Sequence, residues 1–374
     1  MEHLKHILRQ LCGPTSQKRL ADIELISKHD TRQIWRRNKI VPQSFDFCTH
    51  DLIADTAQKT PRCTGDRLST TLAYALVEAG VGPEVIVPLC FEKSMWTVVA
   101  MLGVMKAGGT SLALGTTLPE PRLRSVLETT KPSLIVASVS CQQLATRLLY
   151  TMDGQVILIG ASHVADMRAP SQSNLPLVRP SNSLYVVYTS GTTGVPKEVI
   201  LTHANLSSAI HHQKDIYGYR SSSRVYDFAS YAFDVAWSNV LYTLVCGGVL
   251  CIPSEHERRH NLADSINAFE TTLVTLTPSV ARILLTDTLK RLTKLIVGGE
   301  SLSAPCARAW CRLVNLIIAY GPAECSVSSN VHKIEANATA VALGSIGHSY
   351  GANTWVVQTM NGVRLAPLSC GGEL

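Results

Sequence analysis

A hydroxyl-rich glycine loop is the feature of this sequence with the clearest capacity for chemistry. It follows an apolar run at residues 184–187 and ends in a lysine. Glycine lets backbone N–H groups approach an anion closely, and hydroxyls and an ammonium add donors to the same oxygens. The loop therefore predicts a phosphate cradle, whose donors are Thr189, Ser190, Gly191, Thr192, Thr193, Gly194 and Lys197.

ATP is accordingly the leading candidate ligand, although this loop is not a Walker A sequence of the P-loop kinases and GTPases. Its glycine spacing differs, and no Gly-Lys-Ser/Thr tripeptide follows. Clusters of Gly, Ser and Thr also occur in ordinary solvated turns. Taken alone, the loop leaves both interpretations open.

Charge and composition exclude several classes of function. The 34 Lys and Arg residues against 28 Asp and Glu give a net charge of +6 without a long basic run, so we expect no nucleic-acid partner. The most apolar window, residues 97–118, is interrupted by Lys106 and by glycines, so we expect no membrane partner. The eleven cysteines form no Cys-x-x-Cys pair and the N-terminus lacks the pattern of a signal peptide, which favours a cytoplasmic protein.

Predicted strands alternate with amphipathic helices along most of the chain. The alternation begins with a helix at residues 67–79 and continues through strands at residues 85–90, 133–137, 156–159, 184–187, 249–252 and 273–275. Such alternation predicts an α/β fold of two mostly parallel sheets flanked by helices. After Gly344 the pattern changes to short strands with turns, which predicts an incomplete β-barrel-like end.

Three further motifs follow the loop: FDVAW at residues 233–237, GGE at 298–300 and YGPAE at 320–324. Together with the loop, they have the order and rough spacing found in amino-acid adenylation domains of nonribosomal peptide synthetases. The sequence resembles this branch of the AMP-dependent synthetase/ligase superfamily, in its fungal form, over residues 45–374. Residues 1–44 resemble a linker with the tail of a preceding condensation domain.

The resemblance implies a reaction, its cofactors and its partners. Members of the family use ATP and Mg²⁺ to activate an amino acid as an aminoacyl-adenylate, and then pass the acyl group to the phosphopantetheine of a carrier protein. By this resemblance the loop holds the triphosphate, and Glu324 binds Mg²⁺, a cation that prefers oxygen ligands. Carrier-protein and condensation domains are the implied partners. The residues implied for adenine are Gly298, Gly299, Glu300, Tyr320 and Gly321.

The same resemblance implies a site for the amino acid. Asp234 matches the acid that pairs with the α-ammonium, and a carboxylate in an apolar stretch needs such a partner to offset its burial. Most residues of the implied side-chain pocket are small and none is charged, so we expect a roomy pocket for a neutral amino acid, bulky and aromatic ones included. The pocket residues are Val235, Ser238, Ser279, Ile296, Gly298, Ala319, Val327 and Ser328.

The sequence departs from the family pattern in several places. It lacks the C-terminal subdomain, whose lysine reaches the reacting carboxylate and the α-phosphate, so we expect very poor adenylation by the chain as it stands. An early strand hairpin near residues 62–67 is missing. Glu198 and Ala323 replace a glycine and a threonine of the family, respectively.

Two other functions stay open, namely a non-catalytic remnant or scaffold that keeps the fold, and an acyl-CoA-ligase-type enzyme. Asp234 favours amino-acid activation over acyl ligation, because an acyl substrate has no ammonium to neutralise. Residues 256–260 also match the His-Glu-x-x-His pattern of zinc proteases. Two arginines between the histidines favour a charged surface turn instead.

Overall fold

The structure, a computed structural model, divides into two compact units. One unit joins Met1–Gln43 to Ser349–Leu374, and the other is Ser44–His348. The sequence assigns residues 45–374 to one domain, whereas the structure groups the final segment with the N-terminal residues. The described residues are 2–12, 23–59, 64–150, 152–167, 174–190, 196–284, 288–338, 345–358 and 364–366.

The smaller unit is held together by side chains from both ends of the chain. The Trp35 ring meets the Trp355 ring edge-on, with centroids 5.0 Å apart. Asn38 Nδ2 donates a hydrogen bond of 3.3 Å to the carbonyl of Thr354. The described elements are two helices and an antiparallel ribbon, α1 (Glu2–Leu11), α2 (Lys28–Arg37), β14 (Val357–Gln358) and β15 (Arg364–Leu365).

The first half of the larger unit is a six-stranded sheet in the order β4-β3-β1-β2-β5-β6. Its strands are parallel except for β6, which runs antiparallel to β5. The central strands are buried on both faces, as parallel strands covered by helices require. The strands are β1 (Ile86–Cys90), β2 (Thr110–Leu114), β3 (Leu134–Ser138), β4 (Gln155–Ile159), β5 (Ser183–Ser190) and β6 (Pro196–Thr202).

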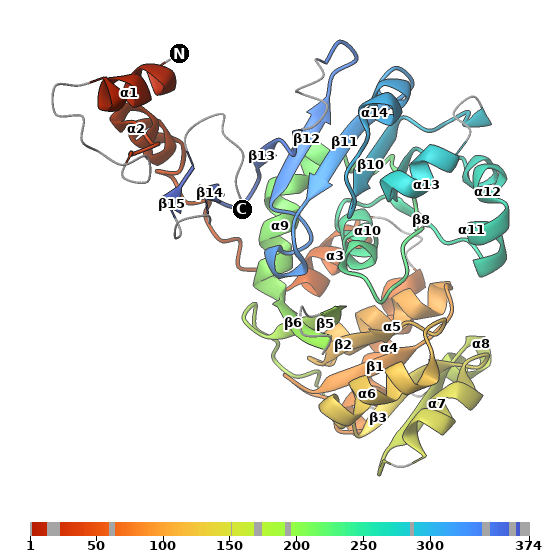
Figure 1. Ribbon diagram of the computed structural model, residues 1–374. Coiled ribbons are helices and arrows are strands. Elements are labelled where there is room, and N and C mark those ends of the chain that lie inside the picture. The colour runs from red at the N-terminus through yellow and green to blue at the C-terminus, as the bar shows by residue number, and fades with distance from the viewer. Residues whose placement is uncertain are drawn as a thin grey trace. The chain divides into compact units, whose positions relative to one another are not determined.

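Helices cover this sheet in the region where Figure 1 labels α4 to α8. The helices α4 and α5 pack so closely that a Cβ at Gly103 would lie only 2.8 Å from Leu72 Cδ2. Apolar residues of α6 and α7 pack against the sheet in one continuous cluster. The helices of this half are α3 (Thr49–Gln58), α4 (Thr64–Glu78), α5 (Met95–Lys106), α6 (Glu120–Thr130), α7 (Gln142–Leu149) and α8 (Ala161–Asp166).

The second half is a seven-stranded sheet in the order β13-β12-β11-β10-β9-β7-β8. Strands β8 to β11 continue the parallel arrangement with β7, and β12 turns back antiparallel to β11. The strands are β7 (Arg224–Tyr226), β8 (Val249–Cys251), β9 (Leu273–Leu276), β10 (Lys294–Gly298), β11 (Asn315–Tyr320), β12 (Asn330–Ile334) and β13 (His348–Ser349).

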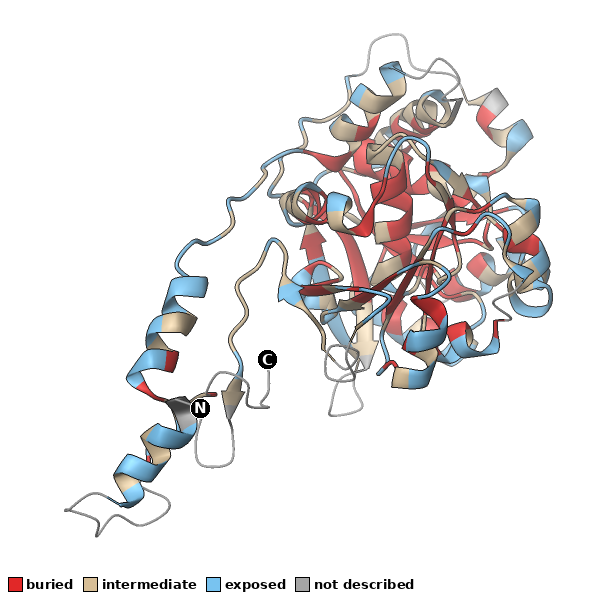
Figure 2. Cartoon of the chain, turned by 90° about the horizontal axis from the view of Figure 1, so that it is seen from above, coloured by how far each residue is buried: buried red, intermediate tan, exposed pale blue. Residues whose placement is uncertain are grey.

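Helices also flank the second sheet, which confirms the predicted α/β class with two mostly parallel sheets. The buried residues follow the strands and the inner faces of the helices, while the outer faces of the helices are exposed (Figure 2). The remaining elements are α9 (His203–Tyr217), α10 (Asp234–Val245), α11 (Glu255–His260), α12 (Leu262–Ala268), α13 (Pro278–Ile283), α14 (Ala304–Trp310) and the 3₁₀ turn η3 (Ala323–Cys325).

No helix among the residues that the structure describes is long and apolar enough to cross a membrane. The sequence predicts that a hairpin of the family is missing near residues 62–67. Residues 62 and 63 lie outside the described residues, and residues 64–67 belong to α4. The short strands expected after Gly344 are β13, β14 and β15.

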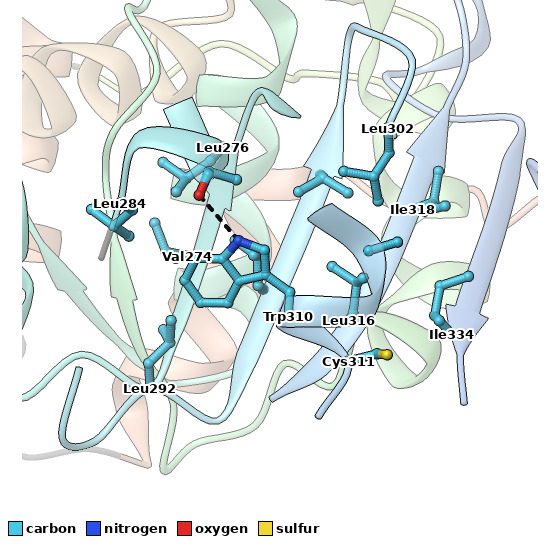
Figure 3. Close-up of a cluster of buried hydrophobic side chains, with 14 of the residues drawn as sticks. Val274, Leu276, Leu284, Leu292, Leu302, Trp310, Cys311, Leu316, Ile318 and Ile334 are labelled. Carbon is cyan, nitrogen blue, oxygen red and sulfur yellow. Dashed lines mark hydrogen bonds between the residues drawn. The ribbon is translucent and has the colours of Figure 1, made fainter. Parts of the chain in front are cut away.

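Trp310 lies at the centre of the core that packs on the second sheet (Figure 3). Its side chain is 2% exposed, and its Nε1 donates to the carbonyl of Ala281 over 3.1 Å. The ring thereby ties α14 to α13 across a cluster of leucines and isoleucines. This large buried ring fixes the helices that follow the ends of β9 and β10.

Replacing Trp310 with alanine should destabilise the chain strongly, because it removes a buried ring and leaves a cavity. We expect a loss of about 3–5 kcal/mol in the free energy of unfolding, measured by denaturant titration. Trp35→Ala is the matched control, since Trp35 is 58% exposed, and should cost much less. Equal losses for the two variants would contradict this assignment of the core.

Candidate active site

Two antiparallel strands, β5 and β6, flank the predicted phosphate loop. Strands β5 and β6 pair in register, so that Thr189 lies opposite Lys197 and Ser190 lies opposite Pro196. Gly191, Thr192, Thr193 and Gly194 lie outside the described residues. The strand expected to end at residue 187 therefore continues to the loop, and a second strand separates the loop from α9.

Lys197 and Glu324 meet directly in the structure. Lys197 Nζ lies 2.8 Å from Glu324 Oε1, and both side chains are exposed. The hydrogen bond from Lys197 is the main reason that the pKa of Glu324 is lowered. In water such a pair is weak, so either partner can leave it for a stronger ligand. The two sequence motifs that imply phosphate and Mg²⁺ thus come together at one place.

Asp234 is the first residue of α10 and is partly buried. Burial raises the pKa of its carboxyl group to about 6, although the backbone N–H of Val235 donates to Oδ1 over 2.8 Å. Desolvation penalises the anion, and a nearby cation would remove that penalty. The carboxylate is therefore suited to accept an ammonium group.

A narrow cavity adjoins the first turn of α10. Its free volume is about 20 Å³, slightly more than one water needs. This is a correction of the roomy pocket expected from the small residues in the sequence. The cavity is lined by Gln213, Tyr217, Tyr219, Val235, Ser238, Tyr242, Thr275, Ile296, Ala319, Val327 and Ser328. Six of these residues belong to the pocket that the sequence implies, and Asp234 precedes one of them.

Tyrosines, which the sequence motifs did not indicate, fill much of the pocket. Tyr242 donates from its hydroxyl to Gln213 Oε1 over 2.9 Å, and Tyr219 donates to Asn239 Oδ1 over 3.2 Å. Burial raises the pKa of Tyr217 to about 12, so its hydroxyl stays neutral. These residues belong to helical or loop segments without a recognisable motif, and only their position in three dimensions reveals the role.

Of the residues that the sequence implies for the pocket, Ser279 and Gly298 do not line this cavity, whereas Thr275, which the sequence did not indicate, does. Both the N–H and the hydroxyl of Ser279 donate to Glu300 Oε2. The Glu300 carboxylate thereby caps the N-terminal turn of α13, where orphan N–H groups need an acceptor. Thr275 lies in β9 and donates to Asn239 Oδ1 over 3.0 Å.

The residues implied for adenine lie at the ends of β10 and β11. A Cβ at Gly298 would approach the carbonyl of Ala319 to 2.7 Å, and a Cβ at Gly321 would approach the N–H nitrogen of Ser329 to 2.6 Å, so both positions need glycine. Gly299 has a φ of 81°, a value that glycine adopts without strain. Tyr320 ends β11 and is 43% exposed, which leaves its ring available to a planar ligand.

Two residues beside the cavity have strained backbones. Ser326 has a φ of 56° and Val327 a φ of 78°. Positive φ is rare for a β-branched residue and costs of order 1–3 kcal/mol. This conformation brings Val327 and Ser328 to the cavity directly after η3, which carries Glu324.

The His-Glu-x-x-His segment is a short helix, α11, and not the turn that the sequence favoured. Ser254 and Glu257 form a reciprocal capping box, which explains why a helix starts here. The Glu257 carboxylate accepts from the N–H and the hydroxyl of Ser254, while His256 and His260 are exposed. The glutamate is thus engaged in the cap, away from any cavity described here.

Comparison with known proteins places this chain in a family. Residues 65–374 match the family model "AMP-binding enzyme". The chain is 42% identical to the nonribosomal peptide synthetase ungA' of Aspergillus campestris over 99% of its length, and 39% identical to the peramine synthetase ppzA of Metarhizium majus over all of it. The chain spans only 4% and 14% of these relatives, respectively.

Solved structures share the fold at low sequence identity. The nonribosomal peptide synthetase FmoA3, bound to alpha-methyl-L-serine-AMP, matches 92% of this chain and 40% of its own with a TM-score of 0.76 and 20% identity. The N-terminal subdomain of Klebsiella oxytoca NpsA matches 87% of this chain and 85% of its own with a TM-score of 0.72 and 18% identity. The fold is that of an adenylate-forming N-terminal subdomain.

This chain belongs to the AMP-binding enzymes. Within that family, its relatives are fungal nonribosomal peptide synthetases.

The Ser279–Glu300 contact predicts a measurable coupling. Glu300→Ala should destabilise the chain by about 1 kcal/mol, because it removes the helix cap, and Ser279→Ala should cost less, because its backbone N–H can still donate to Glu300. The double variant should cost little more than Glu300→Ala alone, as a double-mutant cycle in urea would show. Additive losses would contradict the cap, because they would mean that the two side chains contribute to stability independently.

Proposed function

We propose that this chain binds ATP and a neutral amino acid and joins them as an aminoacyl-adenylate for nonribosomal peptide biosynthesis. The observation that carries the proposal is Asp234, a partly buried carboxylate with a raised pKa beside a narrow cavity that no charged residue among the described ones lines. An α-ammonium group is the partner that this carboxylate lacks. The family and its fungal relatives support the same reaction class.

The chemistry requires little covalent work from the protein. A carboxylate oxygen of the amino acid attacks the α-phosphorus of ATP, the bond from that phosphorus to the bridging oxygen breaks, and pyrophosphate leaves. Charge develops on the phosphate oxygens, so donors fixed around them lower the barrier. Lys197 and the hairpin loop would supply those donors, and Asp234 would hold the amino acid by its ammonium.

Lys197 and Glu324 would separate when nucleotide binds. The ammonium of Lys197 would turn to the phosphates, and the Glu324 carboxylate would bind Mg²⁺, for which an exposed carboxylate near phosphates is a fitting ligand. The metal supplies positive charge to the departing pyrophosphate. Tyr320 would stack on adenine, with Gly298, Gly299, Glu300 and Gly321 beside it. Glu300 would then both lie beside adenine and cap α13.

The side chain of the amino acid would enter the cavity behind Asp234. No charged residue lines it, and a charged side chain would lose its hydration without a partner. The present free volume suits a small neutral side chain, and a larger one would need Gln213 or a tyrosine to move. A carrier protein with its phosphopantetheine and a condensation domain are the proposed partners, by analogy with the relatives.

Amino-acid-dependent exchange of labelled pyrophosphate into ATP, with the full chain and a panel of amino acids, tests the proposal. We expect exchange with small neutral amino acids above the level without amino acid. Binding without any exchange would favour a non-catalytic adenylation fold, and exchange with fatty acids alone would favour an acyl ligase.

Removing the ammonium of Lys197 should weaken nucleotide binding specifically. Lys197→Ala should raise the Kd for a non-hydrolysable ATP analogue with Mg²⁺ about tenfold or more, as the loss of a charge-assisted hydrogen bond implies. Lys333→Ala is a matched control, because Lys333 also forms an exposed pair, 3.7 Å from Glu335. Equal Kd values for the two variants, measured by calorimetry, would remove Lys197 from the phosphate site.

Asp234 should make amino-acid binding dependent on pH. Its raised pKa means that the free protein carries a proton there below about pH 6, and an ammonium ligand must displace that proton. The Kd should therefore fall as pH rises towards 6, approaching a tenfold change per pH unit, and level off above about 7. Asp234→Asn should bind weakly and without this dependence. An unchanged pH profile in that variant would contradict the ammonium assignment.

A further inference from the structure

A fully buried ion pair joins the two sheets of the larger unit, and the proposed reaction does not use it. Lys93 lies between β1 and α5, and Asp227 directly follows β7. Lys93 Nζ lies 2.8 Å from Asp227 Oδ2, and the side chains are 2% and 0% exposed. Since β1 belongs to the six-stranded sheet and β7 to the seven-stranded sheet, the pair links one sheet to the other.

Stability alone does not account for this pair. Desolvation lowers the pKa of Lys93, and the charge of Asp227 offsets only part of that effect. Asp227 Oδ1 is buried and has no hydrogen-bond partner among the described residues. Apolar side chains of similar volume are often as stabilising as a buried ion pair, or more so. The role of the pair therefore lies in its position between the two sheets rather than in the stability that it adds.

Tyr231 connects the pair to the turn that carries Asp234. Its hydroxyl donates to Asp227 Oδ2 over 2.6 Å, and Lys93 Nζ lies 4.0 Å from the centroid of its ring. Its carbonyl accepts a hydrogen bond of 3.2 Å from Trp237 Nε1. Tyr231 and Trp237 lie on either side of Asp234 in the sequence, so these contacts fix both ends of the turn.

The first sheet holds this turn at a second point. The Trp237 ring stacks on the Tyr185 ring, with centroids 4.6 Å apart and planes within 7° of parallel. Tyr185 belongs to β5, which continues to the phosphate loop. The turn around Asp234 follows β7 of the second sheet, and contacts with Lys93 and Tyr185 hold this turn to the first sheet. Its carboxylate is thereby oriented with respect to the loop proposed for ATP.

We propose that Lys93, acting through Asp227 and Tyr231, is a positioning residue for Asp234. The ion pair keeps the turn at residues 231–237 in one conformation, so the Asp234 carboxylate stays in place for an ammonium group. The inference rests on the proposed function, because it assigns the ammonium of an amino acid to Asp234. It extends that function to three residues that touch neither substrate.

Tyr231→Phe is the sharpest test, since it removes one hydroxyl and keeps the ring over Lys93. With the full chain, we expect the Kd for the amino acid selected by the panel to rise about tenfold, as the loss of a hydrogen bond to a charged group implies. The Kd for a non-hydrolysable ATP analogue should not change. A purely structural role would raise both constants together, and that result would overturn the proposal.

Tyr226→Phe is the matched control, at the last residue of β7, the strand that Asp227 follows. The Tyr226 side chain is also buried, and its hydroxyl donates to Ser265 Oγ of α12 over 2.9 Å. The control should lose a similar amount of unfolding free energy without any change in amino-acid affinity. An equal rise in the amino-acid Kd in both variants would overturn the proposal.

Substitutions of Lys93 separate its charge from its bulk. Lys93→Arg should keep most of the amino-acid affinity, whereas Lys93→Met should lose at least as much as Tyr231→Phe. If Lys93→Met fails to fold, the comparison of Tyr231→Phe with Tyr226→Phe still decides. Wild-type affinity in a folded Lys93→Met variant would overturn the role of the charge.

The indole N–H of Trp237 gives a test that needs no ligand. Its hydrogen exchange can be followed by NMR, since the chain has only five tryptophans. We expect faster exchange in Tyr231→Phe than in the wild type or in Tyr226→Phe, because the acceptor carbonyl of Tyr231 loses its anchor. Equal exchange in all three would overturn the positioning role.

A wild-type chain that binds no amino acid would instead contradict the proposed function.

Discussion

The burial of one carboxylate is the constraint on which the site depends. Asp234 opens α10 beside a cavity that no charged residue among the described ones lines, and the backbone N–H groups of Val235 and Asp234 offset only part of the cost of its burial. Because its pKa is higher in the folded chain than in an unfolded one, its contribution to stability falls as pH rises from about 4 to about 6. An ammonium ligand would pair with this carboxylate and offset the cost of its burial.

The parallel sheets explain why this carboxylate lies near groups suited to a nucleotide. The carboxyl ends of parallel strands face the same edge of a sheet, and ligands of α/β proteins gather there. Asp227, Gly298 and Tyr320 stand at or just beyond the ends of β7, β10 and β11. The hairpin of β5 and β6 meets η3 from the other sheet through Lys197 and Glu324. Residues distant in sequence therefore converge without any long loop.

Sequence patterns could predict the parts of the site in which a single residue type is required. Lys197, Glu324 and Asp234 belong to ordered motifs, and the strands β5 and β11, which precede the motifs of Lys197 and Glu324, contain apolar runs. The pocket was less predictable, because its tyrosines look like ordinary core residues in sequence. Ser279 was assigned to the pocket from its motif position alone, because its contact with Glu300, 21 residues away in the sequence, is visible only in the fold. Lys93 and Asp227 stand in no motif, so their pairing also required the structure.

The narrow pocket is a consequence of satisfied polar groups. Gln213 accepts from Tyr242 and donates to the carbonyl of Ser328 over 2.8 Å, so its amide ties two helices to the strained segment after η3. Moving this side chain to admit a larger substrate would break two buried hydrogen bonds, each costly to leave unmade. If the amino acid binds there as proposed, the cavity would discriminate by the cost of rearrangement as well as by its free volume. Specificity of this kind comes from a network that resists displacement, since the apolar residues around it distinguish substrates only weakly.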